Sequence, residues 1–331
     1  MLSWLLALGG GLAACAPRHA VEAEVAPPPL PDRTIARLSD LVSTVGLEWL
    51  VVFRPRALFD VGWLRPSLGR VLKDEGLDAL ARTTGVQVRA ASELAIASYR
   101  REGRDASALH LVRHTSSALD LERKFRERLT SGIERKDLGH QLLGVWGRVG
   151  RGERGFIAIG PDVAGFEYGG DSRRGPARIA LLHAERRLQS SPTASTDEVV
   201  TPLSRLFEPA PAQAYLLGPF EGSAARGARG LLGGATGVGV ALSPAADGVF
   251  ALHVALEGDY AEPETERFLR DSFADLGKSD LGALLGLDAP AAPVDVGRSA
   301  IGLELRTKLD AKRLLAGLAA ALGDQAADLV R

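Results

Sequence analysis

Cys15 is the only cysteine in this chain of 331 residues, so no intrachain disulfide can hold its fold together. A chain without that constraint must be stabilised by the packing of its hydrophobic core. Hydrophobic residues make up 46% of the sequence, which is enough for a core of that kind. Segments with strand and helix periodicity follow one another along the chain, and the sequence therefore predicts a fold of the α+β class.

The first residues have the features of an export leader. Leu2–Ala14 carries no charged side chain, and its length suits the apolar part of a signal peptide, about 7–15 residues. It is shorter than the ~20 residues that a membrane-spanning helix needs. The run Leu12-Ala13-Ala14-Cys15 ends it with an aliphatic residue, two small residues and a cysteine. This run resembles the lipobox of bacterial lipoproteins.

The resemblance implies a covalent lipid anchor. In bacterial lipoproteins the cysteine thiol takes a diacylglycerol, the leader is cleaved in front of it, and the lipidated cysteine becomes the new N-terminus. We therefore expect residues 1–14 to be a signal peptide and Cys15 to be lipidated. Residues 15–34 include Pro27, Pro28, Pro29 and Pro31. Successive prolines favour extended polyproline geometry, so this stretch is predicted to be a semi-rigid tether.

Residues 35–189 are predicted to form a first α+β domain. Its expected elements are strands at 48–54, 94–99, 108–114 and 141–149, and helices at 57–84 and from Ser117 onward. Their order, strand–helix–strand–strand–helix–strand, is typical of a split βαβ or ferredoxin-like unit. A further strand pair within 156–168 and a helix at 177–188 complete the domain.

A break in the pattern separates this domain from a second one. Residues 190–211 are rich in Ser, Thr and Pro and are interpreted as an interdomain linker with a short helix near its end. Residues 212–331 then follow a similar element order, with a strand at 212–220, a hairpin of 238–242 and 249–256, a helix after Pro263, a strand at 299–306 and a final helix capped by Asp310. We therefore expect two tandem ferredoxin-like units, each with an antiparallel sheet packed by helices.

No catalytic motif is complete in this sequence. Gly222-Ser223 lacks the second glycine of a nucleophile elbow. Ser223, His253 and Asp259 could act as a triad only if the fold brought them together. Asp271 and Asp275, four residues apart on an expected helix, are candidates for acid–base chemistry, and a solvated acidic face is the alternative.

Metal, cofactor and nucleic-acid sites are not expected. His110 and His114 lie on an expected strand, where their spacing separates them by ~13 Å, too far to share an ion. The run His183-Ala184-Glu185 resembles the start of a zinc-protease helix, but Arg187 stands where the second histidine would be. Arginines of 123–136 alternate with Glu and Asp, which weakens any attraction for nucleic acid.

Two classes of function follow from these expectations. A lipid-anchored cell-envelope protein without a catalytic site, acting as a binding or assembly module, is favoured by the lipobox, the tether and the incomplete motifs. An envelope hydrolase with a site assembled from scattered residues is the alternative, so enzyme activity stays open.

The expected location and partners depend on Cys15. In composition and element order the whole chain resembles exported lipoproteins of GC-rich Gram-negative bacteria. A lipidated Cys15 would place the protein on the outer membrane, facing the periplasm or the cell surface, with the inner membrane as the other location. The expected partners are the membrane itself and an envelope protein or glycan.

Overall fold

The computed structural model describes residues 35–100, 106–139, 141–169, 175–186, 191–246 and 248–322. The chain divides into two units, Met1–Asp32 and Arg33–Arg331, and the described residues belong to the second. The expected signal peptide, Cys15 and the tether lie outside the described residues. Within the described part of the chain, no helix has the length and apolar character needed to cross a membrane.

The described residues form twelve strands connected by short helices. The strands are β1 (Leu47–Phe53), β2 (Glu93–Tyr99), β3 (Ser107–Arg113), β4 (Ser131–Gly139), β5 (Leu142–Val149), β6 (Gly152–Ile159), β7 (Val163–Tyr168), β8 (Ala212–Leu217), β9 (Ala235–Ala246), β10 (Val249–Gly258), β11 (Asp295–Ser299) and β12 (Gly302–Asp310). The α-helices are α1 (Pro55–Phe59), α2 (Arg65–Val71), α3 (Asp74–Thr84), α4 (Ala118–Arg128), α5 (Pro176–Ala184), α6 (Val200–Phe207), α7 (Gly222–Ala225), α8 (Thr265–Gly277), α9 (Asp280–Leu284) and α10 (Ala311–Leu322). Three 3₁₀ helices accompany them: η1 (Leu38–Leu41), η2 (Val88–Ala90) and η3 (Gly227–Gly234).

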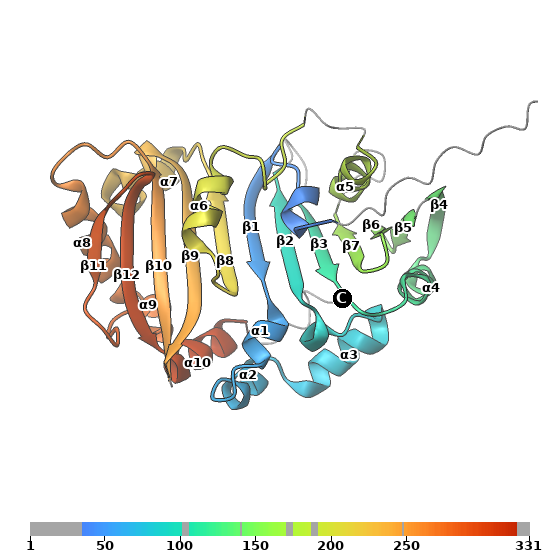
Figure 1. Cartoon of the computed structure of the whole chain (residues 1–331), viewed down its shortest axis with the longest axis horizontal. Helices are drawn as coiled ribbons and strands as arrows, with labels where there is room; N and C mark the ends of the chain where they lie inside the picture. Colours follow the sequence, from blue (N-terminus) through green and yellow to red (C-terminus); the bar gives the residue numbers. More distant parts are fainter. Residues whose placement is uncertain are drawn as a thin grey trace, which may run out of the picture. The chain divides into compact units, whose positions relative to one another are not determined.

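All twelve strands belong to one antiparallel sheet. Their order is β11-β12-β10-β9-β8-β1-β2-β3-β7-β6-β5-β4 (Figure 1). Because helices pack on an antiparallel sheet, the α+β class is confirmed.

The ferredoxin-like strand order is not confirmed. In a split βαβ unit the first two strands run parallel and the third lies between them, whereas β1 and β2 pair directly and antiparallel. The reason lies in the helical connection, whose ends meet: the Arg56 N–H donates to the Ala91 carbonyl at 3.2 Å. The chain therefore leaves β1 and enters β2 at the same end of the sheet.

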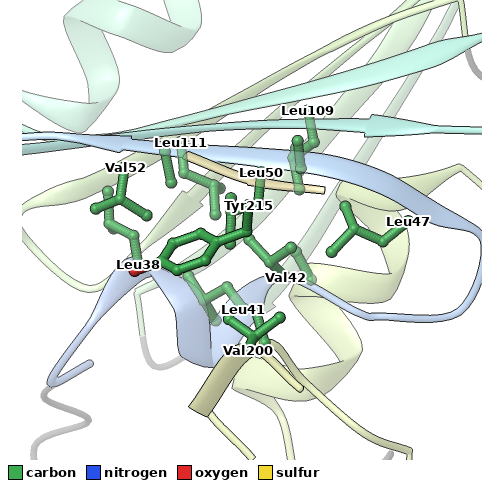
Figure 2. Packing of buried hydrophobic residues seen from close by; sticks show 14 of the residues in the cluster. Leu38, Leu41, Val42, Leu47, Leu50, Val52, Leu109, Leu111, Val200 and Tyr215 are labelled. Atoms are coloured by element: carbon green, nitrogen blue, oxygen red, sulfur yellow. The ribbon is translucent and has the colours of Figure 1, made fainter. Parts of the chain in front are cut away.

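The pairing of β1 with β8 joins the two predicted domains. Leu50 lies opposite Tyr215 in this register, and both side chains enter one buried cluster (Figure 2). The expected linker, 190–211, contributes to the same cluster through Val200 and Leu203 of α6. The two predicted domains therefore share one sheet, and α6 is part of the fold instead of a spacer.

The two halves of the sheet have the same connectivity. In each half a short helix, η1 or α6, precedes the first strand, and a helical segment leads to a hairpin, β2–β3 or β9–β10. A helix then leads to strands that return beside that hairpin, which gives the orders β1-β2-β3-β7-β6 and β8-β9-β10-β12-β11. The first half adds β4 and β5 at its outer edge.

Helices cover the two faces of the sheet unequally. We call the face that packs against η1, α5 and α6 the α6 face. The opposite face, called the α8 face, packs against α1, α2, α8 and α10 over one half and against α4 over the other. Strand β10 shows the division, because Phe250, Leu252 and Leu256 enter the α8-face cluster while Ala255 enters the α6-face cluster.

The last helix of each half takes a different position. In the first half α5 contacts η1 and strands β3, β5, β6 and β7 on the α6 face. In the second half α10 contacts α2 and α9 and packs into the α8-face cluster. Among the described residues, α6 is therefore the helix that packs on the α6 face of the second half.

Several local expectations need correction. Strand β4 was not expected, and the predicted strand 299–306 spans the turn between β11 and β12. Ser117 begins α4 as its N-cap, but its side chain makes no capping hydrogen bond. The cap of α10 is confirmed, because Arg313 N–H donates to Asp310 Oδ1 at 2.8 Å.

Candidate functional site

The structure does not bring the candidate triad together. Ser223 lies in α7, which packs on η3, and η3 contributes Leu231 to the α8-face cluster. His253 lies on β10 opposite Ala241, on the α6 face. Asp259 follows six residues later, ~20 Å further along an extended strand. These residues therefore form no triad.

The other three histidines of the described ranges, His110, His114 and His183, lie apart from the candidate triad. The ring of His110 lies 4.8 Å from the ring of Tyr168, and burial lowers the pKa of His110 to about 4. His114 is buried at the end of β3, and His183 lies in α5. Within the described ranges, no three His, Cys, Asp or Glu side chains form a group that could hold a metal ion.

The carboxylates of α8 are paired with an arginine. Arg229 Nη1 lies 3.1 Å from Asp271 Oδ2, and Arg229 Nη2 lies 2.6 Å from Asp275 Oδ2. The hydrogen bond from Arg229 lowers the pKa of Asp275. A lowered pKa keeps the Asp275 carboxylate ionised, so Asp275 lacks the raised pKa that a general acid needs.

A pocket opens on the α6 face of the second half, where α5 has no counterpart. Its volume is about 430 Å³, within the ~300–1,000 Å³ of small-molecule sites. The end of α6 and the residues after it form one wall, strands β9, β10 and β12 form the floor, and the segment before β11 forms the other wall. The lining residues are Leu206, Phe207, Glu208, Pro209, Ala210, Ala241, Ser243, Ala251, Leu252, His253, Ala292, Pro293, Arg306, Thr307 and Lys308.

Two glycines of β9 let α6 lie close to the sheet. A Cβ atom on Gly237 would meet the Val199 side chain, and one on Gly239 would meet the ring of Phe207. Phe207 in turn meets the ring of His253 edge to face, with centroids 5.0 Å apart. The close approach of α6 therefore fixes the wall of the pocket against its floor.

His253, which lines the pocket, forms a buried polar pair with Glu304 of β12. His253 Nε2 and Glu304 Oε2 are 2.9 Å apart, and their side chains are only 18% and 10% exposed. Arg306 Nη2 donates to the same carboxylate oxygen at 2.6 Å. Antiparallel pairing explains the arrangement, because Arg306 lies opposite His253 and two residues from Glu304 on β12.

The charge states of this pair follow from its surroundings. Burial lowers the pKa of His253, although the hydrogen bond to Glu304 acts in the other direction. Burial acts to raise the pKa of Glu304, but hydrogen bonds from Ser299 and His253 and the charge of Arg306 outweigh it and lower that pKa. The Nε–H of Arg306 donates to His253 Nε2 at 3.3 Å, so this ring nitrogen lies between the guanidinium group and the Glu304 carboxylate.

The mouth of the pocket carries unbalanced positive charge. Glu208 forms an ion pair with Arg37 at 2.8 Å, and Glu304 is held by His253 and Arg306. Lys308 is exposed and has no ion pair within the described part of the chain. The Arg306 side chain is 59% exposed. Lys308 and the Nη1 atom of Arg306 are therefore available to solvent or to a ligand.

A second titratable group lies further along the α6 face. Burial raises the pKa of Glu257, opposite Gly237, to about 7, and the nearby charges of Asp197 and Glu198 add to the effect. Its Oε2 atom is buried without a hydrogen-bond partner in the described structure.

The sequence analysis named His253 only as a member of a possible triad, and it did not predict a role for Glu304, Arg306 or Lys308. These three alternate with Leu303, Leu305 and Leu309 in the sequence, which indicates a polar face on a strand. The missing information was the register between β10 and β12, which sets His253 beside them.

Comparison with known proteins assigns no family. No family model matches the sequence, and no curated protein is similar to it at a significant level. A solved structure described as "Structure of crystal form IV of TP0453" aligns with a TM-score of 0.48 and 10% sequence identity. The alignment covers 86% of this chain and 97% of that chain. Similarity at this level carries no conclusion about function.

Proposed function

We propose that this protein is a lipid-anchored binding module of the bacterial cell envelope, held at the membrane through Cys15. The observation that carries the binding role is the pocket on the α6 face, which combines apolar walls with the polar side chains of His253, Arg306 and Lys308. Sites for small ligands are typically concave and mostly apolar with a few placed polar groups. The lipobox-like run ending at Cys15 supports the anchor and with it a location on a membrane of the cell envelope, the outer or the inner one.

The anchor is tested by fatty-acid labelling of cells that express the chain. Cys15→Ser should remove the label and leave an uncleaved precursor, because the thiol is the lipid acceptor in lipoproteins. Ser3→Ala is the matched control, since it alters the leader without touching the acceptor. Equal labelling of the wild-type protein and Cys15→Ser would end the lipoprotein proposal.

The binding role is tested by purifying the protein from detergent-solubilised envelope and identifying what accompanies it. Ala251 lines the pocket floor, so Ala251→Phe should fill the pocket and remove specifically bound molecules. Leu119→Phe on α4 is the control, because Leu119 is 69% exposed and distant from the pocket lining. Identical sets of bound molecules in wild type and Ala251→Phe would contradict a binding role for the pocket, provided both variants have native circular dichroism spectra.

An envelope hydrolase is the second candidate. The His253–Glu304 pair has the geometry of a base oriented by a carboxylate, and Ser243 lines the same pocket. No hydrogen bond joins Ser243 to His253 among the described residues. A hydrolase would cleave p-nitrophenyl esters and lose this activity in His253→Ala. A binding module would show the same slow background rate with either protein.

A further inference from the structure

We propose that the pocket on the α6 face binds a small organic carboxylate with an apolar body, the carboxylate lying between Arg306 and Lys308. This inference rests on the proposed binding role and adds the chemical class of the ligand.

The fold itself explains why this pocket is open. In the first half, α5 covers the strands beside the central hairpin and packs Ala177, Ala180 and Leu181 into the α6-face cluster. In the second half, α10 packs on the other face, with Leu314 and Leu315 in the α8-face cluster. The equivalent strands, β10 and β12, therefore keep a surface beside α6 that another molecule can cover.

The shape and lining suit a compact apolar group. Leu206, Phe207 and Pro293 are among the wall residues, and the small side chains of Ala241 and Ala251 keep the floor low. Burying such a group removes apolar surface of both molecules from water, which favours binding. A purely hydrophilic ligand would leave these walls without a partner.

The charged side chains of the pocket favour a negatively charged ligand. Glu208, which lines the pocket, is engaged by Arg37, and Glu304, beside His253 and Arg306, is engaged by both of these residues. Arg306 donates from Nη2 to Glu304 and from Nε to His253, which leaves its Nη1 atom to donate to a ligand. Lys308 adds three donors and a full charge. An anionic ligand would gain two charge-assisted hydrogen bonds, while a cationic ligand would meet two like charges.

The test uses three ligands of the same shape: 4-phenylbutyrate, 4-phenylbutylamine and 4-phenylbutanol. Calorimetric titration of the purified full chain in a non-ionic detergent should show saturable binding of the carboxylate. The alcohol should bind at least tenfold more weakly, and the amine should not bind measurably. Amine binding as tight as carboxylate binding would overturn the proposal, as would the absence of carboxylate binding.

Variants then locate the site. Lys308→Gln and Arg306→Gln should each weaken phenylbutyrate binding about tenfold. Lys312→Gln removes an exposed lysine from α10, on the other face, and should bind like wild type. Unchanged affinity in Lys308→Gln would overturn the proposed site.

The outcome is separable from the proposed function. If no carboxylate binds while Ala251→Phe still loses its co-purifying molecules, the proposed binding role is supported and the proposed carboxylate ligand is wrong. If Ala251→Phe changes nothing and no carboxylate binds, the binding role of the pocket falls as well.

Discussion

The α6 face carries ionisable side chains that are partly buried. Donors surround Glu304 and keep it ionised, whereas the charges near Glu257 are the carboxylates of Asp197 and Glu198. Two glutamates on neighbouring strands thus have pKa values displaced in opposite directions. The difference comes from their neighbours, because both are partly desolvated.

The first prediction concerns Glu257. Its pKa in the folded protein, about 7, lies above the ordinary value of 4.5, so the folded state binds the extra proton between these values. The contribution of Glu257 to the free energy of unfolding should therefore be most favourable at low pH and should fall as the pH rises from 4.5 to 7. Glu257→Gln should raise the free energy of unfolding at pH 8 by about 1 kcal/mol, a value reduced for partial exposure.

Urea denaturation at pH 5 and pH 8 measures this effect. The variant should gain little at pH 5, where Glu257 of the folded wild type is largely protonated. Glu264→Gln, an exposed carboxylate on the segment before α8, serves as the control and should change neither value. A loss of stability in Glu257→Gln at pH 8 would disprove the raised pKa as the dominant effect.

At the scale of elements, the sequence predicted strands and helices that have a local hydrophobic pattern, and it did not predict features that depend on which strands pair. The alternation of Phe250, Leu252, Val254 and Leu256 identified β10 and its apolar face correctly, because side chains alternate across a strand. The sequence of β4 is polar on both faces, so it carries no apolar pattern and was missed. Leu276 follows the periodicity of α8 but is 48% exposed, because it lies at the end of the helix beyond the packed cluster.

The order of elements along the sequence did not show which strands pair with each other in the sheet. The pairing of β1 with β8 joins residues more than 150 positions apart, and nothing in either strand specifies its partner. The same limit applies to the site, because the sequence shows polar alternation on β12 but not its register with His253. Long-range pairing therefore accounts for both the wrong topology and the missed residues of the pocket.

The second prediction concerns α6 as an element. Phe207 is buried against Gly239 and His253, so Phe207→Ala would leave a cavity between helix and sheet. Substitutions of this kind cost about 3–5 kcal/mol. The free energy of unfolding from urea titration should fall by this amount, while Leu119→Ala at an exposed position should change it by less than about 0.5 kcal/mol. A loss below 1 kcal/mol for Phe207→Ala would show that α6 is only loosely held.

At the scale of the whole described unit, one sheet replaces the two domains expected from the sequence. The central cluster draws side chains from both halves, including Leu50 of β1 and Tyr215 of β8 (Figure 2). Opening the junction between the halves would expose these side chains and leave the hydrogen-bonding groups of two strands unpaired. The two halves should therefore unfold together.

The third prediction is a single unfolding transition. Trp63 lies in the α8-face cluster near Phe250, and Trp146 is buried in the α6-face cluster of the first half. Variants that keep only one of these tryptophans report on different halves of the sheet. Their fluorescence midpoints in urea should coincide with each other and with that from far-UV circular dichroism. Midpoints that differ between the two tryptophans would indicate that the two halves unfold as independent domains.

The outer strand β4 has a consequence for how neighbouring molecules meet. A sheet that is not closed leaves hydrogen-bonding groups free along its end strands, and such edges invite aggregation. Glu134, Arg135, Lys136 and Asp137 lie in succession on β4, and charged side chains discourage a second chain from adding to the sheet. For a protein that we propose to be anchored at a membrane surface, this charged edge would keep adjacent copies apart while the pocket of each stays accessible.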